Sequence, residues 1–294
     1  MIEIQGHGVA MITPFRENGS IDFDAIPAIV EHLIDGGVDY LVVLGTTAET
    51  ATLSQQEKKE LVDTIIASNS GRLPLVLGWG GNHTLELVEL LDGFDLSSFS
   101  ALLSVTPYYN KPNQEGLYQH YKTLANHSSL PFILYNVPSR TGVNIAPETV
   151  LRLATDFKNI VAIKEASGDF QQVQTLIKMC PPGFTILSGD DEMSLSMILA
   201  GAQGVISVIG NAIPGLYSKI IQHGLNRNVE EAYTLQYRAL DLIRMIYDEG
   251  NPTGVKVLME ALGLCENHLR LPLVEASDGL RLKLRNELKN TISS

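Results

Sequence analysis

The sequence predicts a (β/α)8 barrel followed by a C-terminal helical region, and three observations lead to this prediction. The chain has 294 residues, which is enough for one large α/β barrel or for two ordinary domains. Eight short apolar runs of strand length recur up to residue 208, separated by segments with apolar residues at helical spacing. After residue 228 only helical patterns continue. Strands that alternate with helices in this number are typical of a closed parallel barrel.

The predicted strands are rich in apolar and β-branched residues, as expected for a parallel sheet buried on both faces. They span residues 8–12, 40–44, 74–77, 101–105, 132–135, 160–165, 185–187 and 205–208. Two of the intervening helices, at 54–68 and 113–126, begin with Ser54 and Asn113, residue types that cap helix N-termini.

The chain divides by pattern into a predicted barrel at 1–227 and a helical region at 228–294 that packs on it. Within 230–247, apolar residues recur at three- and four-residue steps, which predicts one apolar helix face. These residues are Tyr233, Tyr237, Leu240 and Ile243.

Two further helices are expected near the C-terminus. Asn251 followed by Pro252 is typical of an N-cap and a first helical residue, so a helix is expected to start there and run to residue 262. At least one more helix is expected within 271–288.

Composition and charge exclude several classes of protein. Hydrophobic residues make up 45% of the chain and charged residues 18%, unlike a disordered protein. Lys and Arg number 21 against 33 Asp and Glu, a net charge of −12 with no basic block, which argues against binding to nucleic acid or to an anionic membrane. No run has the pattern of a signal peptide or the length of a membrane span, so a cytoplasmic location is expected. Cys180 and Cys265 form no Cys-x-x-Cys pattern, so neither a disulfide framework nor a zinc site is indicated.

Lys164 is out of place at the end of the apolar run 160–165. Burial there would lower the pKa of its ammonium group below the ordinary value, and a neutral lysine is a nucleophile toward carbonyl carbons. A lysine that reaches the surface or pairs with Glu165 is the alternative that this run alone leaves open.

Other chemically suited residues follow neighbouring strands, at the end where barrel enzymes carry their active sites. Thr46 and Thr47 enter a loop and can present hydroxyl and N–H groups to a carboxylate, although an ordinary turn has the same pattern. Tyr108 and Tyr109 lie between prolines, which suits an interface or a proton-carrying hydroxyl, or aromatic packing under a loop.

The fifth and seventh runs also end in polar residues. Tyr135 suits proton transfer, and Arg140, in a loop bounded by Pro and Gly, suits capture of a carboxylate, unless it is merely solvated. Asp190 and Asp191 most simply cap the next helix. The glycine-rich run 78–82 lacks the spacing of a nucleotide-binding loop, and the seven histidines show no metal-ligand spacing, so neither a nucleotide nor a metal is expected.

With these residues assembled, the chain resembles the dihydrodipicolinate synthase family of pyruvate-dependent class I aldolases, nearly from end to end. Five motifs carry the resemblance: Gly-Thr-Thr at 45–47, Thr-Pro-Tyr-Tyr-Asn at 106–110, Tyr-Asn-Val-Pro-Ser-Arg-Thr-Gly at 135–142, Ile-Lys-Glu-Ala-Ser-Gly at 163–168 and Leu-Ser-Gly-Asp-Asp at 187–191.

The resemblance implies that Lys164 forms a Schiff base with pyruvate, with no other cofactor, and that Thr46 and Thr47 hold the pyruvate carboxylate. It further implies a proton relay of Thr47, Tyr135 and Tyr109, in which Tyr109 comes from the neighbouring subunit of a dimer within a homotetramer.

The second substrate implied is L-aspartate 4-semialdehyde, whose carboxylate is received by Arg140. Gly189 and Ile206 match positions that line the pocket. The product would be 4-hydroxy-tetrahydrodipicolinate. Its formation would be the first committed step of the diaminopimelate route to lysine.

Two positions depart from the family pattern. Ala48 stands where a glycine is usual, which a right-handed or extended backbone tolerates and a left-handed one does not. Trp79 places an indole where threonine is frequent.

A candidate effector cleft also matches the family in part. It comprises Thr50, Ala51, Gln55, Lys58, Asn82, Glu86 and Tyr108. Lysine-sensitive members carry histidines where this chain has Gln55 and Lys58. A cationic Lys58 disfavours a cationic effector, so inhibition by lysine is expected to be weak or absent.

Two alternatives remain beside the synthase. One is an aldolase for a 2-keto sugar acid of the sialic acid type, disfavoured because those relatives usually lack the arginine at 140. The other is a non-catalytic barrel that binds a metabolite, which predicts loss of Lys164, Tyr135 or the threonine pair, and all are present.

Overall fold

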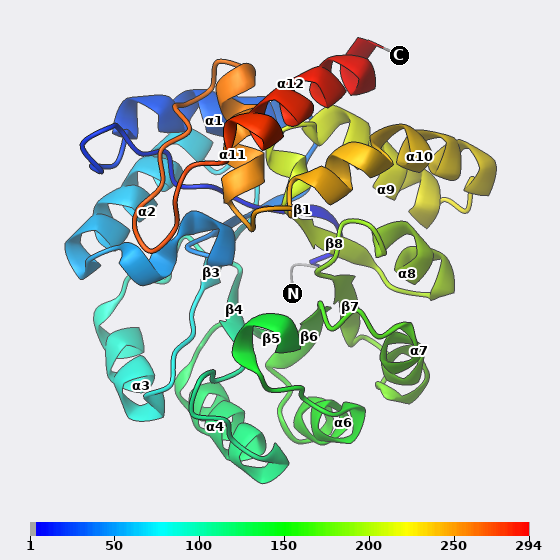
Figure 1. Cartoon of the computed structure of the whole chain (residues 1–294). Helices are drawn as coiled ribbons and strands as arrows, with labels where there is room; N and C mark the ends of the chain where they lie inside the picture. Colours follow the sequence, from blue (N-terminus) through cyan, green and yellow to red (C-terminus); the bar gives the residue numbers. More distant parts are fainter. Residues whose placement is uncertain (1–3, 294) are drawn as a thin grey trace.

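The computed structural model describes residues 4–293 and contains a closed parallel barrel in which the eight strands pair in chain order, β8 returning to β1. Figure 1 shows the strands at the centre and helices around them. The predicted (β/α)8 barrel is therefore confirmed. Its strands are β1 (Gly6–Ala10), β2 (Tyr40–Val43), β3 (Leu75–Gly78), β4 (Ala101–Val105), β5 (Phe132–Asn136), β6 (Ile160–Glu165), β7 (Thr185–Ser188) and β8 (Gly204–Ser207).

The predicted strand boundaries are right to within a residue or two. The largest difference is at β1, which starts and ends two residues earlier than the predicted 8–12. Gly6 pairs with Gly204 of β8, so the strand begins where its neighbour begins. Beyond it, the Ile12 N–H donates to Asn211 Oδ1 at 3.1 Å instead of to a strand, so hydrogen bonding to a side chain ends the pairing.

Helices connect the strands and form the outer layer (Figure 1). The helices between strands are α1 (Ile26–Asp35), α2 (Gln55–Asn69), α3 (Thr84–Gly93), α4 (Gln114–His127), α5 (Pro138–Thr141), α6 (Pro147–Asp156), α7 (Phe170–Met179) and α8 (Ser194–Ala200). Short 3-10 helices are η1 (Phe23–Ala25), η2 (Thr46–Ala48), η3 (Thr50–Thr52) and η4 (Ile209–Asn211). Ser54 and Asn113 cap α2 and α4 as predicted, since their side chains accept from Glu57 N–H and Gly116 N–H.

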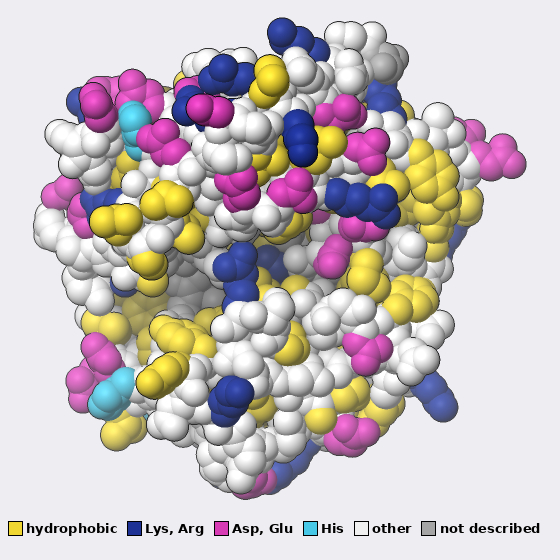
Figure 2. All heavy atoms as spheres, viewed as in Figure 1, with side chains coloured by type: hydrophobic (Ala, Val, Ile, Leu, Met, Phe, Trp, Pro, Cys, Tyr) yellow, Lys and Arg dark blue, Asp and Glu magenta, His cyan; other side chains and the backbone are white. Residues whose placement is uncertain are grey.

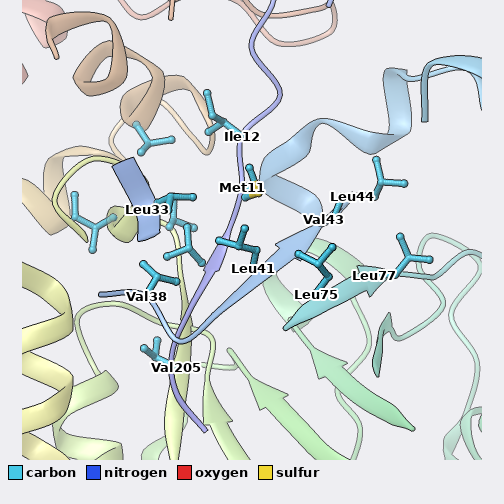
Figure 3. Close-up of a cluster of buried hydrophobic side chains, with 14 of the residues drawn as sticks. Met11, Ile12, Leu33, Val38, Leu41, Val43, Leu44, Leu75, Leu77 and Val205 are labelled. Atoms are coloured by element: carbon cyan, nitrogen blue, oxygen red, sulfur yellow. The ribbon is translucent and has the colours of Figure 1, made fainter. Parts of the chain in front are cut away.

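The core has two parts, one between the strands and the helices and one inside the barrel. In the first, Leu41 of β2 and Leu75 of β3 gather with Leu33 of α1 (Figure 3). In the second, side chains of alternate strand positions fill the barrel, among them Val42, Ile133 and Ile206. Successive strand residues point to opposite faces, so each strand contributes to both.

Within the part of the chain that the structure describes, four helices follow the barrel: α9 (Pro214–Leu225), α10 (Val229–Met245), α11 (Thr253–Ala261) and α12 (Asp278–Ser293). The predicted apolar face of α10 is partly wrong, because Tyr237 is 66% exposed while Ala232, Gln236 and Ala239 are buried. Small residues allow α10 to approach α9, and Tyr237 stacks on Tyr233 outside that contact.

The predicted start of α11 is also wrong. Pro252 occupies the N-cap and the helix begins at Thr253. Asn251 points toward the barrel instead of capping, because its Nδ2 donates to Thr47 Oγ1 at 3.2 Å. Of the helices described between residues 4 and 293, none is both long and apolar enough to cross a membrane.

Candidate active site

A cavity of about 350 Å³ opens at the carboxyl ends of the barrel strands and is partly covered by the C-terminal helices. Figure 2 shows Lys or Arg atoms near the middle of this face, at the right edge of a hollow. The lining residues of the cavity come from β1, β2, β4, β5, β6, β7 and β8 or the segments that follow these strands, and from α10 and the segment after it. They include Gly45, Thr46, Thr47, Tyr135, Arg140, Lys164, Gly189, Tyr247 and Asn251.

Lys164 lies in this cavity, at the end of β6, and is 4% exposed. Its strand neighbour in β5 is Tyr135, and Lys164 Nζ lies 4.5 Å from the centroid of the Tyr135 ring. A Cβ on Gly189 would lie 2.9 Å from Lys164 Cε, so a glycine is needed there to make room for the lysine side chain. The side chain is buried and does not reach the surface.

Burial lowers the pKa of Lys164 to about 8, the Asp191 carboxylate opposes this shift, and the Arg140 guanidinium favours it. The alternative, a pairing of Lys164 with Glu165, does not occur. Glu165 is the next strand residue and points the other way, where Asn136 and Gln172 donate to its carboxylate. Lys164 is therefore a buried amine with an accessible neutral form near physiological pH.

Tyr135 lies beside Lys164, and its phenol is buried. Burial raises the pKa of Tyr135, while the positive charge of Arg140 and a hydrogen bond with the Thr46 side chain act in the opposite direction. The resemblance paired Tyr135 with Thr47, whereas here Thr46 is the partner of Tyr135. The Thr47 hydroxyl instead accepts from Asn251.

The turn that carries both threonines is held by several hydrogen bonds. Thr50 Oγ1 donates to Gly45 O at 2.8 Å and Thr13 Oγ1 donates to Ala48 O at 2.7 Å. Ala48 lies in η2 and is not among the residues with left-handed backbone, so the departure from glycine is tolerated. The left-handed residue is Glu49, at φ 53°.

Glu49 anchors this turn to the C-terminal region. Lys256 of α11 donates to Glu49 Oε1 at 2.6 Å, and both side chains are fully buried, at 0% and 1% exposure. The Arg270 N–H donates to the other carboxylate oxygen at 3.1 Å. A buried pair with additional hydrogen bonds holds the turn at its far end.

Arg140 is exposed and lines the cavity from the single-turn helix α5. Gly142 ends this helix in a left-handed conformation, at φ 70°. Asn136 closes the loop, because its Nδ2 donates to Asn144 Oδ1 at 2.7 Å and its Oδ1 accepts from Ile145 N–H at 3.1 Å. The loop is therefore fixed at both ends by one side chain next to Tyr135.

The acids after β7 do more than cap a helix. Asp190 accepts from Glu192 N–H and Met193 N–H, as capping predicts. Asp191 is different, because it is 1% exposed and accepts from the N–H groups of Val208 and Ile209 and from the Tyr247 hydroxyl. Burial raises the pKa of Asp191, and these backbone donors lower it.

Two predicted site residues lie outside the cavity lining. Tyr109 is 92% exposed and has a left-handed backbone, at φ 63°. Ile206 is fully buried inside the barrel, and Val208, two residues on, lines the cavity instead.

The candidate effector residues are partly brought together. Asn82 and Tyr108 exchange hydrogen bonds, since Tyr108 N–H donates to Asn82 Oδ1 at 2.8 Å and Asn82 Nδ2 donates to Tyr108 O. Burial lowers the pKa of Lys58, and the nearby Glu86 carboxylate raises it. Among residues 4–293, no hydrogen bond joins Thr50, Ala51 or Gln55 to this pair. Trp79 points away, because its indole donates to Leu87 O at 3.2 Å and packs on Phe94.

Sequence reasoning missed the residues that the C-terminal region contributes. Tyr247, Arg244 and Asn251 line the cavity, and Arg244 pairs with Glu192 at 2.5 Å. Nothing in the helical pattern distinguishes them, since Asn251 has the sequence context of an N-cap.

Within residues 4–293, no three His, Cys, Asp or Glu side chains are grouped to hold a metal ion.

Known proteins are similar to this chain in sequence and fold. A sequence model of the Dihydrodipicolinate synthetase family matches residues 3–291. A curated relative from Flavobacterium psychrophilum, 4-hydroxy-tetrahydrodipicolinate synthase, is 56% identical over 279 residues, covering 95% of each chain.

Solved structures agree. The chloride-inhibited dihydrodipicolinate synthase from Acinetobacter baumannii, complexed with pyruvate, is 40% identical with a TM-score of 0.94, covering 98% of this chain and 99% of that one. The enzyme from Cyanidioschyzon merolae with lysine bound is 34% identical with a TM-score of 0.93, covering 97% and 98%. The match spans both the barrel and the helices that follow it, so the chain belongs to the dihydrodipicolinate synthetase family.

Proposed function

We propose that the chain is a 4-hydroxy-tetrahydrodipicolinate synthase that condenses pyruvate with L-aspartate 4-semialdehyde through a Schiff base on Lys164. The observation that carries the mechanism is Lys164 itself, a buried lysine in the cavity whose pKa burial lowers to about 8. The activity follows the family and the curated relatives.

The first half of the reaction uses the neutral amine. Lys164 Nζ attacks the ketone carbon of pyruvate, and loss of water leaves an imine. The imine withdraws electrons, so the pyruvate methyl group loses a proton and becomes an enamine carbon. Tyr135 is placed to move these protons because its phenol lies beside Lys164 and bonds the Thr46 side chain.

The second half joins the two substrates. The enamine carbon forms a bond to the aldehyde carbon of the semialdehyde, and the aldehyde oxygen takes a proton. The amine of the second substrate then attacks the imine carbon, which closes the ring and releases Lys164. Arg140 lies at the cavity and is proposed to bind the semialdehyde carboxylate. No cofactor beyond the covalent pyruvate enters these steps.

The proposal includes a homotetramer in which Tyr109 acts across a dimer interface. Its support is that Tyr109 is 92% exposed in a single chain, which is unusual for an aromatic side chain. It also includes a cytoplasmic location, for which the free thiols of Cys180 and Cys265 are the support. Sedimentation would test the assembly, and a monomer with full activity would contradict the role of Tyr109.

Weak or absent inhibition by lysine is also proposed. Glu86 already has the cationic Lys58 as a neighbour, so a second cation gains less there. The solved structure of the Cyanidioschyzon merolae relative has lysine bound. An inhibition curve with strong effect at micromolar lysine would contradict this part of the proposal.

The decisive experiment is borohydride reduction in the presence of pyruvate, followed by peptide mass analysis. A pyruvyl adduct is expected on Lys164, and Lys164→Ala should abolish it. The buried Lys256 serves as the internal control, because it is equally shielded but paired with Glu49. An adduct on Lys111 or Lys256, or none at all, would overturn the mechanism.

The role of Arg140 is tested separately. Arg140→Ala should raise the Michaelis constant for the semialdehyde by at least about tenfold, since a charge-assisted hydrogen bond is lost, while pyruvate trapping continues. Unchanged semialdehyde kinetics would show that another group binds the carboxylate.

A further inference from the structure

Asn251 lies between α10 and α11, far from the barrel strands in sequence, yet its side chain reaches the cavity. It is 8% exposed and lines the cavity beside Thr47. Its Nδ2 donates to Thr47 Oγ1 at 3.2 Å. The C-terminal region therefore contacts the hydroxyl of a threonine in the turn that faces the substrate cavity.

This hydrogen bond has a direction, and the direction matters for substrate binding. A threonine hydroxyl carries one proton, which can be donated once. Because Asn251 donates to the Thr47 oxygen, that proton is not used on Asn251 and is available to an acceptor in the cavity. A carboxylate only accepts hydrogen bonds, so it needs Thr47 as a donor.

Holding the backbone of the turn does not require Asn251. Thr50 and Thr13 bond the carbonyl oxygens of Gly45 and Ala48, and Lys256 bonds the Glu49 carboxylate. Among residues 4–293, the one hydrogen bond of the Asn251 side chain goes to the Thr47 hydroxyl. Its effect is therefore on the orientation of a proton, not on the path of the chain.

The other end of the Asn251 amide points to the same conclusion. Asn251 Oδ1 is buried and has no hydrogen-bond partner among residues 4–293. A buried acceptor without a partner costs folding free energy. Stability of the fold alone does not explain an amide at this position.

We propose that Asn251 is a positioning residue for pyruvate: its amide N–H holds the Thr47 hydroxyl as a hydrogen-bond donor toward the pyruvate carboxylate. This inference rests on the proposed function, because it assumes that pyruvate occupies the cavity. It assigns to the C-terminal region a part in binding the first substrate.

A double-mutant cycle tests the proposal. The measured quantity is the pyruvate concentration that gives half-maximal borohydride trapping on Lys164. Asn251→Ala should raise it about tenfold, because the hydroxyl can then turn its proton elsewhere. Thr47→Val should raise it at least as much. Adding Asn251→Ala to Thr47→Val should change nothing further, since no hydroxyl remains to orient.

Asn251→Asp gives a second, independent variant. An aspartate carboxylate only accepts hydrogen bonds, so the Thr47 hydroxyl would donate to it and would no longer donate to a ligand in the cavity. The half-saturating pyruvate concentration should therefore rise more than in Asn251→Ala. Asn267→Ala is the matched control, since it removes another buried amide of the C-terminal region, 3% exposed and outside the cavity lining. That control should keep wild-type pyruvate saturation, and thermal unfolding of every variant checks folding.

The outcomes separate this inference from the proposed function. Wild-type protein that traps no pyruvate contradicts the proposed function. Wild-type protein that traps pyruvate on Lys164, together with an Asn251→Ala variant of unchanged half-saturation, overturns the inference alone. So does an Asn251→Ala effect of the same size in the Thr47→Val background, because a purely structural role would persist there.

Discussion

Lys164 and Lys256 are both buried, but they differ in their charged neighbours. Lys256 has the Glu49 carboxylate at 2.6 Å, whereas Lys164 has no carboxylate within ion-pair distance among residues 4–293. Removing an ammonium from water without an ion pair disfavours its charged form. Burial lowers the pKa of both ammonium groups, and in Lys256 the Glu49 carboxylate and its hydrogen bond act in the opposite direction.

The rate of imine formation should follow the ionisation of Lys164. Its pKa is lowered from the ordinary value to about 8, and only the neutral amine attacks pyruvate. The trapping rate at low pyruvate should rise about tenfold per pH unit below pH 8 and level off above it. A rate that is flat between pH 6 and 8, or that still rises above pH 9, would contradict this.

Asp191→Asn sharpens the same prediction. The Asp191 carboxylate raises the pKa of Lys164, so its removal should move the midpoint of the profile to lower pH. Asp190→Asn is the matched control, because Asp190 caps the neighbouring turn, whereas the charges that shift the pKa of Lys164 are those of Asp191 and Arg140. Equal shifts in the two variants would show that the effect is not local to Asp191.

At the scale of elements, β6 carries two different functions on its two faces. Lys164 points into the cavity, and Glu165 points toward α7, where Gln172 Nε2 donates to it at 3.0 Å and Ser167 N–H at 2.7 Å. Asn136 Nδ2 also donates to Glu165, at 3.0 Å, and Asn136 closes the Arg140 loop. A buried carboxylate thus connects β6 to the loop after β5.

Glu165→Gln should therefore weaken binding of the second substrate. The amide NH2 of glutamine would face the amide donors of Asn136 and Gln172, which leaves donors unpaired and loosens the loop. The Michaelis constant for the semialdehyde should rise about tenfold, with a smaller change for pyruvate. Steady-state kinetics measure both constants.

A surface substitution of the same chemistry controls this prediction. Glu148 is exposed on α6, and Glu148→Gln should leave both constants unchanged. If Glu165→Gln raised the two constants equally, the carboxylate would be supporting Lys164 as well as the Arg140 loop.

At the scale of the whole molecule, the C-terminal region contacts the barrel loops through Lys256. Lys256 of α11 bonds Glu49 and the carbonyl of His268, and it lies 4.3 Å from the centre of the Phe15 ring. Lys256→Met should destabilise the fold by about 3–5 kcal/mol, because it leaves the Glu49 charge buried without its partner. Urea unfolding measures this loss.

The double variant Lys256→Met with Glu49→Gln controls for the buried charge. It should recover part of the stability, since no carboxylate remains unpaired. A double variant less stable than the sum of the two single variants would contradict a role for the ion pair.

Acid should destabilise the fold through His7. Burial lowers the pKa of His7 to about 3, and its Nδ1 lies 2.8 Å from Ser218 Oγ. Between pH 6.5 and 3 the unfolded chain binds a proton that the folded chain does not, so the free energy of unfolding falls as pH falls. The slope from this group approaches about 1.4 kcal/mol per pH unit.

Urea unfolding at several pH values checks this prediction. His7→Asn should remove that part of the slope, while the same substitution at the exposed His127 serves as the matched control. An unchanged slope in His7→Asn would mean that other groups set the acid sensitivity.

Much of the fold could be predicted because it depends on local pattern. The apolar runs and the caps at Ser54 and Asn113 report on residues next to one another, and the structure confirms them. The family is confirmed as well, because its motifs are contiguous. The division at residue 227 and the individual residue roles stay predictions.

The sequence by itself determined the barrel, its family, and the strand ends at which Lys164, Tyr135 and the threonine pair lie. Only the tertiary structure decided that Thr46 bonds Tyr135, that Asn251 bonds Thr47, and that Asp191 acts on Lys164. Those contacts join residues up to 204 positions apart, and no local period records them. Lys164 could be predicted from its own strand, whereas the residues that contact it come from other parts of the sequence and are brought together only when the chain folds.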